Sequence, residues 1–315
     1  MKKYIEIILV VLICISGIIL GFIKEIELSE LQLKTIKILS YICLGSILYC
    51  FLVGEISRNN SQMDKLWSIL PIVYTFVIMI MGKFQIRLVI IALLVTLWEI
   101  RLTYNFALKG AYSWKFWEGK EDYRWSILRK KKIFQNKFVW ALFNLFFISF
   151  YQNFLVLAIT FPAVVAMNAA NAFNVFDVVA LIFALVFLGI ETIADIQQWK
   201  FHKKKKELLS TGAKLEEIEA PYNKGFNTIG IWNRSRHPNY LGEQGFWVAI
   251  YLFTLGIGVN HLLIFNWSIF SCLLLILLFL GSSTLGEAIS SSKYPEYKEY
   301  QKKTSKYIPL WKYNG

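Results

Sequence analysis

Long apolar stretches separated by short polar ones dominate the pattern of this sequence. A helix needs about 20 consecutive apolar residues to cross the hydrocarbon core of a bilayer, and the chain reaches that length repeatedly. The pattern predicts an all-α, polytopic transmembrane helical bundle. The third and seventh of its eight expected spans are short, so seven or nine spans are also compatible with the pattern. The eight spans are 4–23, 36–54, 66–81, 86–104, 138–161, 175–199, 246–259 and 263–285.

The first of these stretches could also be read as a secretory signal, since Lys2 and Lys3 precede it. It is longer than the apolar part of most signals, it contains Glu6, and no Ala-x-Ala-like cleavage site follows it. We therefore interpret 4–23 as a retained membrane span.

The positive charges are unevenly distributed among the predicted loops. Lys and Arg number nine in 105–137, nine in 199–245 and six in 286–315, whereas 162–174 and the tight turn at 259–262 have none. Basic loops stay on the cytoplasmic side of a membrane, and an eight-span topology places all three basic segments on one side. The same topology predicts that both termini are cytoplasmic, in a bacterial inner membrane or the endoplasmic reticulum.

Composition and absent motifs exclude several functional classes. A net charge of +13 can indicate nucleic-acid binding, but these charges adjoin span ends, where anionic headgroups attract them. We expect membrane lipids, and no nucleic acid, as partners. The sequence has only three histidines, no CxxC pair, and no Rossmann, phosphate-loop, HExxH or GxSxG motif, so we expect no metal site and no Rossmann-type crevice. The cysteines are interpreted as apolar packing residues: Cys14, Cys43, Cys50 and Cys272.

The charge map divides the chain at residue 104. We predict an N-terminal part of four spans, 1–104, and a C-terminal part, 105–315, in which four spans alternate with basic cytoplasmic segments rich in Trp and Tyr. Neither half repeats the other, as the halves of transporters commonly do, and no linker separates them. We therefore expect one integrated membrane domain.

The segment 222–247 holds the densest group of polar candidates and reads YNKGFNTIGIWNRSRHPNYLGEQGFW. Pro238 disfavours helix at His237, so a loop is predicted to end there and a helix to start. The free amide groups of the first turn favour an anion, and two arginines just before it add phosphate donors. An interfacial loop with aromatic anchors is the alternative. The candidate ligands of this segment are Arg234, Arg236, His237, Asn239, Tyr240 and Glu243.

A second polar group lies near the cytoplasmic end of span 175–199. Its members are spaced i, i+4, i+7 and i+11, and therefore share one helix face: Glu191, Asp195, Gln198 and His202. Two carboxylates near the bilayer boundary are costly unless they meet a cavity or a cation. We expect the arginines of 222–247 or the lysine run 203–206 as their partners, in a cofactor site or in a structural ion pair.

Span 86–104 and the C-terminal tail supply the remaining candidates. Glu99 and Arg101 are two residues apart, so they cannot face each other on a helix and each needs its own partner within the membrane. The stretch that follows, KGAYSWKFWEGKEDYRW, is aromatic and of mixed charge. Such a stretch is typical of an interfacial loop that covers a pocket. The tail KYPEYKEYQKKTSKYIPLW could lie on the membrane surface as a helix or close the pocket.

RHPNYLGE, together with segments before and after it, resembles a known sequence pattern. The multi-span core, RHPNYxGE, a tight helical hairpin and a YxxY…IP tail resemble the steroid 5α-reductase-type C-terminal domain. RLTYNFALKGAYSWKFWEGKEDYRW and GIETIADIQQW are similar to the uncharacterised membrane branch of that superfamily, and the similarity covers most of 98–315. The distantly related isoprenylcysteine carboxyl methyltransferases carry a similar RHPxYxG pattern with a different cofactor.

The resemblance implies an NADPH-dependent reduction of a carbon–carbon double bond, usually conjugated to a carbonyl, in a lipid-like or steroid-like substrate that enters from the bilayer. By motif position, it implies that Asn239, Glu243 and Asp195 contact the cofactor and that Arg101 borders the cavity. The tail matches loosely at Tyr297, Tyr300 and Lys303. The full set of candidate cofactor-binding residues is Arg101, Glu191, Asp195, Arg234, Arg236, His237, Asn239, Tyr240, Glu243, Tyr297 and Lys303.

Steroid reductases polarise the substrate carbonyl with a Glu and Tyr pair from their N-terminal half, and this chain departs from that pattern. Trp98 or Glu99 stands where the tyrosine is expected. We take Glu99 and Tyr104 as candidate catalytic residues, with Asp64 as a further candidate acid.

Two other functions stay open: an S-adenosylmethionine-dependent methyltransferase, and a non-enzymatic lipid-binding protein. The paired arginines and nearby lysines favour NADPH, because its phosphates carry more negative charge than the methyl donor does.

Overall fold

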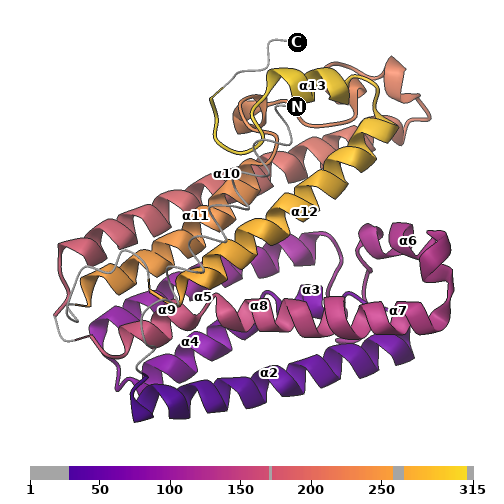
Figure 1. Ribbon diagram of the computed structural model, residues 1–315. Coiled ribbons are helices and arrows are strands. Elements are labelled where there is room, and N and C mark those ends of the chain that lie inside the picture. The colour runs from indigo at the N-terminus through magenta and orange to yellow at the C-terminus, as the bar shows by residue number, and fades with distance from the viewer. Residues whose placement is uncertain (1–27, 170–171, 258–265, 311–315) are drawn as a thin grey trace. The chain divides into compact units, whose positions relative to one another are not determined.

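The computed structural model describes residues 28–169, 172–257 and 266–310, and in these ranges the chain is helical, without a β-strand (Figure 1). The all-α class is therefore confirmed for this part of the chain. The span predicted at 4–23 and the tight turn at 259–262 lie outside the described residues, as does Cys14.

The described chain forms two compact units. The N-terminal unit takes the described residues from 28 to 180 and from 250 to 272, and the C-terminal unit takes those from 181 to 249 and from 273 to 310. Helices α10 (Val175–Leu209), α11 (Pro238–Leu252) and α12 (Ile269–Lys293) have residues in both. The other helices of the N-terminal unit are α2 (Glu30–Ser57), α3 (Gln62–Leu66), α4 (Leu70–Met81), α5 (Ile86–Leu108), α6 (Tyr123–Arg129), η1 (Lys132–Gln135), α7 (Lys137–Phe143), η2 (Asn144–Tyr151), α8 (Gln152–Ala158), α9 (Phe161–Ala166) and η6 (Phe253–Gly256). Those of the C-terminal unit are η3 (Leu215–Glu217), η4 (Tyr222–Lys224), η5 (Gly230–Asn233) and α13 (Tyr297–Lys303).

Four helices in the described chain are long and apolar enough to cross a membrane, judged by length and composition: α2, α10, α12 and the run Lys137–Ala166, which joins α7, η2, α8 and α9. They have 28, 35, 25 and 30 residues, respectively, and coincide with four of the predicted stretches. Four such helices fit a membrane protein. The count of eight spans and the orientation of the termini stay predictions.

An apolar stripe on α2 faces away from the protein interior. Leu44, Leu48, Leu52 and Ile56 recur every four residues, which places them on one helix face, and they are 52–82% exposed. Soluble monomers rarely expose so large an apolar patch. The stripe is expected where a helix contacts lipid.

The helices differ in length from the apolar stretches that predicted them. α10 continues ten residues past its predicted end at 199, and α12 extends to Lys293 rather than 285. Hydropathy detects the part of a helix that suits lipid, whereas the backbone hydrogen bonds continue into water. α4 is the opposite case: it begins at Leu70, with Pro71 in its first turn, and its 12 residues are too short to cross a bilayer as one helix.

Local signals explain both ends of α2. Ser29 and Gln32 form a capping box, in which the Gln32 amide donates to Ser29 Oγ (3.2 Å) and the Ser29 amide donates to Gln32 Oε1 (3.0 Å). The helix ends at Ser57, and Arg58 follows it in the left-handed conformation, with a φ of 58°.

A buried ion pair joins three segments of the N-terminal unit. Arg87 Nε and Nη2 donate to the two carboxylate oxygens of Asp177 at 2.6 and 2.7 Å. Arg87 Nη2 also donates to the Gly256 carbonyl (3.1 Å). The two side chains are 3% and 0% exposed. The starts of α5 and α10 and the end of η6 are thereby held together.

Candidate functional site

The predicted start of α11 is confirmed, because the helix begins at Pro238. Proline suits this first position, where its missing amide proton has no helical acceptor. The residues just before it are paired with the tail: the Arg236 amide donates to the Ser305 carbonyl (2.9 Å) and the His237 amide donates to the Lys306 carbonyl (3.0 Å). The loop therefore enters α11 in a fixed, extended path.

Glu287, on α12, fixes the side chains of this loop. Its Oε1 accepts from Arg236 Nε (2.8 Å) and pairs with His237 Nε2 (2.9 Å), and its Oε2 accepts from the Gln301 side chain (2.8 Å). Arg236 Nη1 also donates to the carbonyls of Gln301 (2.9 Å) and Thr304. Glu287 is 3% exposed. Arg236 was expected to pair with Glu191 or Asp195, but it binds the carboxylate of Glu287 instead.

Burial lowers the pKa of His237 below its ordinary value of 6.5 and outweighs the opposing effect of Glu287. His237 is therefore neutral near pH 7, with the proton on Nε2 that Glu287 accepts. The ring stacks on Tyr240 at 5.2 Å between centroids. The Tyr240 ring in turn contacts the Phe279 ring, with 4.6 Å between their centroids. Tyr240, one of the candidate ligands, is therefore packed against α12.

The tail is held by aromatic packing. Tyr297 and Tyr300 of α13 are buried against Phe226, with ring centroids 5.0 and 5.3 Å away. The Tyr300 hydroxyl donates to the carbonyls of Trp232 and Ser235. Burial raises the pKa of Tyr297, so its hydroxyl stays protonated. Lys303, by contrast, is exposed. The tail therefore forms a short helix that braces the loop before α11.

The loop before α11 also lies on α10. The Trp232 indole donates to the Ala194 carbonyl (3.0 Å) and the Ile231 amide donates to the Gln197 side chain (3.0 Å). Gly230 has a φ of 64°, a left-handed conformation that glycine adopts without strain, and lies against Gln197. These contacts place the loop beside the α10 turn that carries Asp195.

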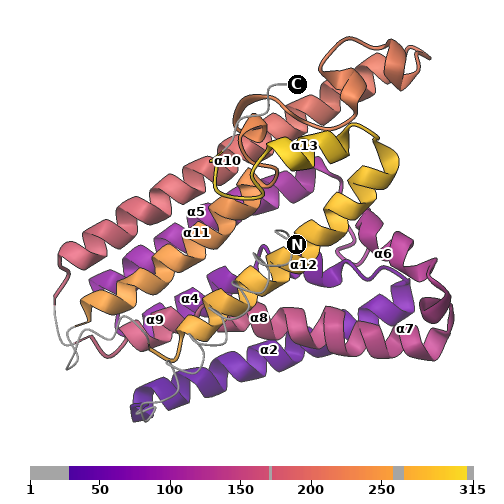
Figure 2. The same cartoon turned by 45° about the horizontal axis from the view of Figure 1, so that its top comes forward.

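Helices α10 and α11 lie side by side in both views (Figures 1 and 2) and approach closely at two glycines. A Cβ on Gly242 would lie 2.6 Å from Glu191 Cβ, and one on Gly245 would collide with the Phe187 ring. Because Phe187 precedes Glu191 while Gly245 follows Gly242, the helices are antiparallel. Continued by one turn, the same antiparallel spacing puts Asn239, three residues before Gly242, near the level of Asp195, four residues after Glu191.

This interface is rich in hydrogen-bond acceptors. Glu191 and Glu243 are 1% and 9% exposed, and Asp195 is half-buried. The Asn239 Oδ1 and Gln198 Oε1 atoms are buried, and no donor from the described residues reaches either of them. Gln198 Nε2 is engaged with His202 (3.0 Å), which leaves the oxygen as its free end. A buried acceptor without a donor is costly, so the arrangement suits a ligand that brings donors.

The cations near this interface differ in their availability. Lys205 donates to the Gly225 carbonyl (2.7 Å), and Lys203 lies over the Trp199 ring at 5.1 Å. Arg234 is exposed, and its side chain forms no ion pair within the described chain. Arg234 is therefore the arginine of the motif that remains available to an anion.

The remaining candidates lie in the N-terminal unit. Glu99 is fully buried on α5, and Arg101 lies over the Trp98 ring at 5.8 Å. Tyr104 is 64% exposed and, five residues along the helix, lies on a different face from Glu99. The structure thus does not bring the two candidate catalytic side chains together, and their catalytic role stays a prediction.

Asp64, the further candidate acid, is held in place by neighbouring side chains of the N-terminal unit. Its carboxylate accepts from the Trp125 indole (3.1 Å) and lies 3.7 Å from Arg124. Burial raises the pKa of Asp64, although Arg124 opposes the shift. Trp125 belongs to the aromatic stretch predicted to be an interfacial loop, and this contact ties that stretch to α3.

Sequence reasoning missed Glu287, the acid on which this loop is anchored. One signal was present: Glu287 is a single carboxylate near the end of the last long apolar helix, and such an acid needs a partner. The sequence did not indicate which of the basic residues would be that partner.

Comparison with known proteins gives a family and a relative. A family profile described as "Protein of unknown function (DUF1295)" matches residues 50–304. The chain is 37% identical over 281 residues to "Uncharacterized protein C594.04c" of Schizosaccharomyces pombe (strain 972 / ATCC 24843), which covers 86% of this chain and 78% of that protein. No solved structure matches the chain significantly. Neither description states an activity, so chemistry has to be argued from the site.

Proposed function

The chain belongs to the family described as "Protein of unknown function (DUF1295)", and we propose that it is a membrane-embedded reductase that uses NADPH to reduce a carbon–carbon double bond. The substrate would be lipid-like or steroid-like, with the double bond conjugated to a carbonyl. One observation carries the proposal: the acceptor-rich interface of α10 and α11 lies directly behind a rigidly held, basic helix-entry loop.

The acceptors suit the polar parts of a nicotinamide nucleotide. Its carboxamide and ribose hydroxyls are donors, and Asn239 Oδ1 and Gln198 Oε1 are buried acceptors that lack one among the described residues. The buried carboxylates of Glu191 and Glu243 add strong acceptors. The phosphates need cations, and Arg234 is exposed next to the same loop.

The bound cofactor would supply the hydride, and the chain's own residues would orient it and exclude water. The network around Glu287 keeps Arg236 and His237 fixed, so the first turn of α11 is held before any ligand arrives. Preorganisation of this kind lowers the entropy lost on binding. Glu99 and Tyr104 remain the proposed proton donors or carbonyl-polarising groups.

The apolar helices suit a substrate that is dissolved in the bilayer. The proposal includes the eight-span topology with both termini in the cytoplasm, in a bacterial inner membrane or the endoplasmic reticulum. The similarity of RHPNYLGE and the tail to the steroid 5α-reductase type supports the choice of reaction.

One observation favours the second candidate, a methyltransferase using S-adenosylmethionine. Arg236 is engaged by Glu287 and by tail carbonyls, which removes one of the two arginines that favoured a phosphate-rich ligand. An interface with two buried carboxylates also suits the ammonium and sulfonium groups of the methyl donor. The two cofactors must therefore be compared directly.

The test is an equilibrium titration of the detergent-purified full chain with NADPH, followed by nicotinamide fluorescence, and a parallel titration with S-adenosylmethionine. We expect submillimolar NADPH binding, weakened about tenfold or more by Asn239→Ala or Glu243→Gln, since removing one partner of a buried hydrogen bond costs roughly 1–3 kcal/mol, and more when a charged group is involved. Glu296→Gln, an exposed acid on the tail, is the control.

Each outcome of the titrations bears on the proposal. Binding of S-adenosylmethionine without an NADPH response would replace the reductase by the methyltransferase. Binding of neither would leave the non-enzymatic lipid-binding function. NADPH binding that both variants leave unchanged would place the cofactor elsewhere.

A further inference from the structure

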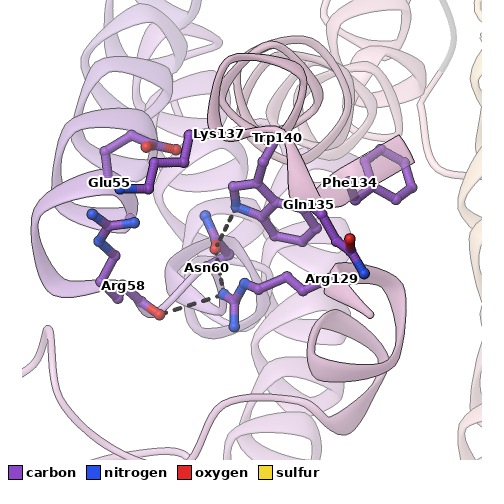
Figure 3. A pocket seen from close by; sticks show the side chains of 9 residues that line it. Glu55, Arg58, Asn60, Arg129, Phe134, Gln135, Lys137 and Trp140 are labelled. Atoms are coloured by element: carbon purple, nitrogen blue, oxygen red, sulfur yellow. Dashed lines mark hydrogen bonds between the residues drawn. The ribbon is translucent and has the colours of Figure 1, made fainter. Parts of the chain in front are cut away.

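A cavity of about 250 Å³, lined mostly by polar and charged residues, lies in the N-terminal unit between the end of α2 and the start of α7 (Figure 3). Gly54, Glu55 and Arg58 line it from α2 and the turn after it. Lys137 and Trp140 line it from α7. None of these residues belongs to the candidate cofactor site, so the cavity needs an explanation of its own.

The charge of the lining is predominantly positive. Arg58, Arg129 and Lys137 face a single carboxylate, that of Glu55, which accepts from Asn144 Nδ2 (2.7 Å). Arg129 is paired with Glu121 (2.6 Å). The side chains of Arg58 and Lys137 have no ion pair or hydrogen bond with any residue that the structure describes. Two cations thus border the cavity against the one carboxylate of Glu55 and are paired with neither it nor any other described acid, so the lining keeps a net positive charge that favours an anion.

The inner wall of the cavity is rigid and offers a donor. Asn60 Oδ1 accepts from Trp140 Nε1 (3.2 Å) and Arg129 Nη2 (2.6 Å), and both bonds meet at Asn60 in Figure 3. These two donors fix which end of the amide is oxygen, so the nitrogen faces the other way, towards Gly54. Asn60 is 3% exposed, and its Nδ2 has no acceptor in the described part of the chain. An oxygen of a bound anion would supply that acceptor.

The cavity lies where two membrane-length helices end. The apolar run of α2 stops at Val53, one residue before the cavity lining starts, and Lys137 is the first residue of the apolar helix Lys137–Ala166. This is the level at which hydrocarbon gives way to lipid headgroups. Trp140 adds an amphipathic ring of the type found at that level, and Arg129 lies over its face at 4.8 Å.

We propose that this cavity binds the phosphate of an anionic phospholipid headgroup, with Arg58 and Lys137 as its cationic contacts and Asn60 as its neutral donor. The acyl chains of the lipid would extend along the exposed apolar stripe of α2. A free phosphate presents the same chemistry, but the position at the ends of two membrane-length helices favours the lipid. The proposal does not depend on the reductase activity.

The experiment measures binding of short-chain phosphatidylglycerol to the full chain in mild detergent by native mass spectrometry, with phosphatidylcholine and inorganic phosphate as parallel arms. The test variant is Arg58→Gln with Lys137→Gln, which removes two exposed charges that bond to no described residue. Its matched control, Lys131→Gln with Lys132→Gln, removes the same charge from exposed positions outside the lining. Circular dichroism checks that both variants are folded.

We expect the double variant of the lining to lose about tenfold or more in phosphatidylglycerol affinity, since each Lys or Arg near an anionic headgroup contributes roughly 1 kcal/mol. The control should change by less than about threefold. Equal binding of phosphatidylcholine, or equal losses in both variants, would overturn the proposed site. Displacement of the lipid by inorganic phosphate at similar concentration would show that the free anion is the ligand and would overturn the lipid assignment.

Discussion

Replacing Glu287 by alanine should release the C-terminal tail, and the size of the effect follows from the contacts of this residue. Glu287 is bonded to Arg236, His237 and Gln301, and is 3% exposed. Without it, the Arg236 guanidinium, 11% exposed, keeps only backbone carbonyls as partners. Removing one member of a buried ion pair costs about 3–5 kcal/mol. Because Arg236 retains its bonds to Gln301 and Thr304, the lower figure of about 3 kcal/mol is expected.

The loss should appear locally, as faster amide hydrogen exchange in α13 and the strand-like segment after it. A change of about 3 kcal/mol raises the population of the open tail more than a hundredfold, since about 1.4 kcal/mol corresponds to a factor of ten. Exchange followed by mass spectrometry on peptides covering 297–307 measures it. Glu287→Gln should give a smaller acceleration because its carbonyl still accepts one bond.

The control for this prediction is Glu299→Gln. Glu299 pairs with Lys302 at 2.9 Å, but the two side chains are 53% and 73% exposed, and an exposed pair contributes little. Exchange in the tail should therefore change by less than about threefold. If Glu287→Ala left the exchange of 297–307 within that same range, the assignment of Glu287 as the anchor of the tail would be refuted.

Three further predictions concern packing, pH and topology. Gly242→Ala should destabilise the fold by about 1–3 kcal/mol in thermal unfolding, because its Cβ would lie 2.6 Å from a side-chain atom of α10. Gly281→Ala is the control, because a Cβ at Gly281 would meet open space. Equal effects of the two substitutions would contradict the close packing of α10 and α11. Burial lowers the pKa of His237, so the folded state favours the neutral imidazole. The stability that this preference contributes is fully present above pH 6.5 and is lost as the pH falls through the lowered pKa of the folded state. His237→Gln should weaken the acid-side decline in a plot of melting temperature against pH. An unchanged decline would exclude His237 as its origin. Cysteines at Ala172 and Lys203 should label from opposite sides of sealed vesicles, since α10 rises about 1.5 Å per residue between them, and labelling from one side would contradict the span.

Local signals in the sequence predicted the helices well. The proline at 238 predicted where α11 starts, and apolar runs predicted α2, α5, α10 and α12. Cys43, Cys50 and Cys272 are buried and form no disulfide with one another, as expected for cysteines that pack among apolar neighbours. Such features depend on neighbours within a few turns. Helix ends were less accurate, because α10 continues through the basic run 203–206, where hydropathy has already changed sign.

The pairing of charges was not predictable in the same way. Arg236 and Glu287 are 51 residues apart, and Arg87 and Asp177 are 90 apart. In each case the sequence shows a charge that needs a partner but offers several of the right sign. Only tertiary packing decides among them, because a few ångströms determine whether a buried pair offsets its desolvation. The spacing of Glu191 and Asp195 correctly placed them on one helix, yet their expected partner Arg236 lies on a different acid.

The RHPNYLGE segment therefore divides into a scaffold and a candidate ligand-binding part. Arg236 and His237 hold the loop to α12 and the tail, whereas Asn239 and Glu243 lie on the first turns of the helix that the loop fixes. A motif of this kind need not signal a ligand that contacts all of its members. Since an unpaired buried guanidinium is more costly than no charge, Arg236 depends on Glu287 for structural reasons, whatever the ligand is. Asn239 differs in that its buried Oδ1 accepts no bond from the described chain. Because a buried acceptor without a donor is costly, Asn239 is the residue of the motif on which the proposed ligand most directly rests.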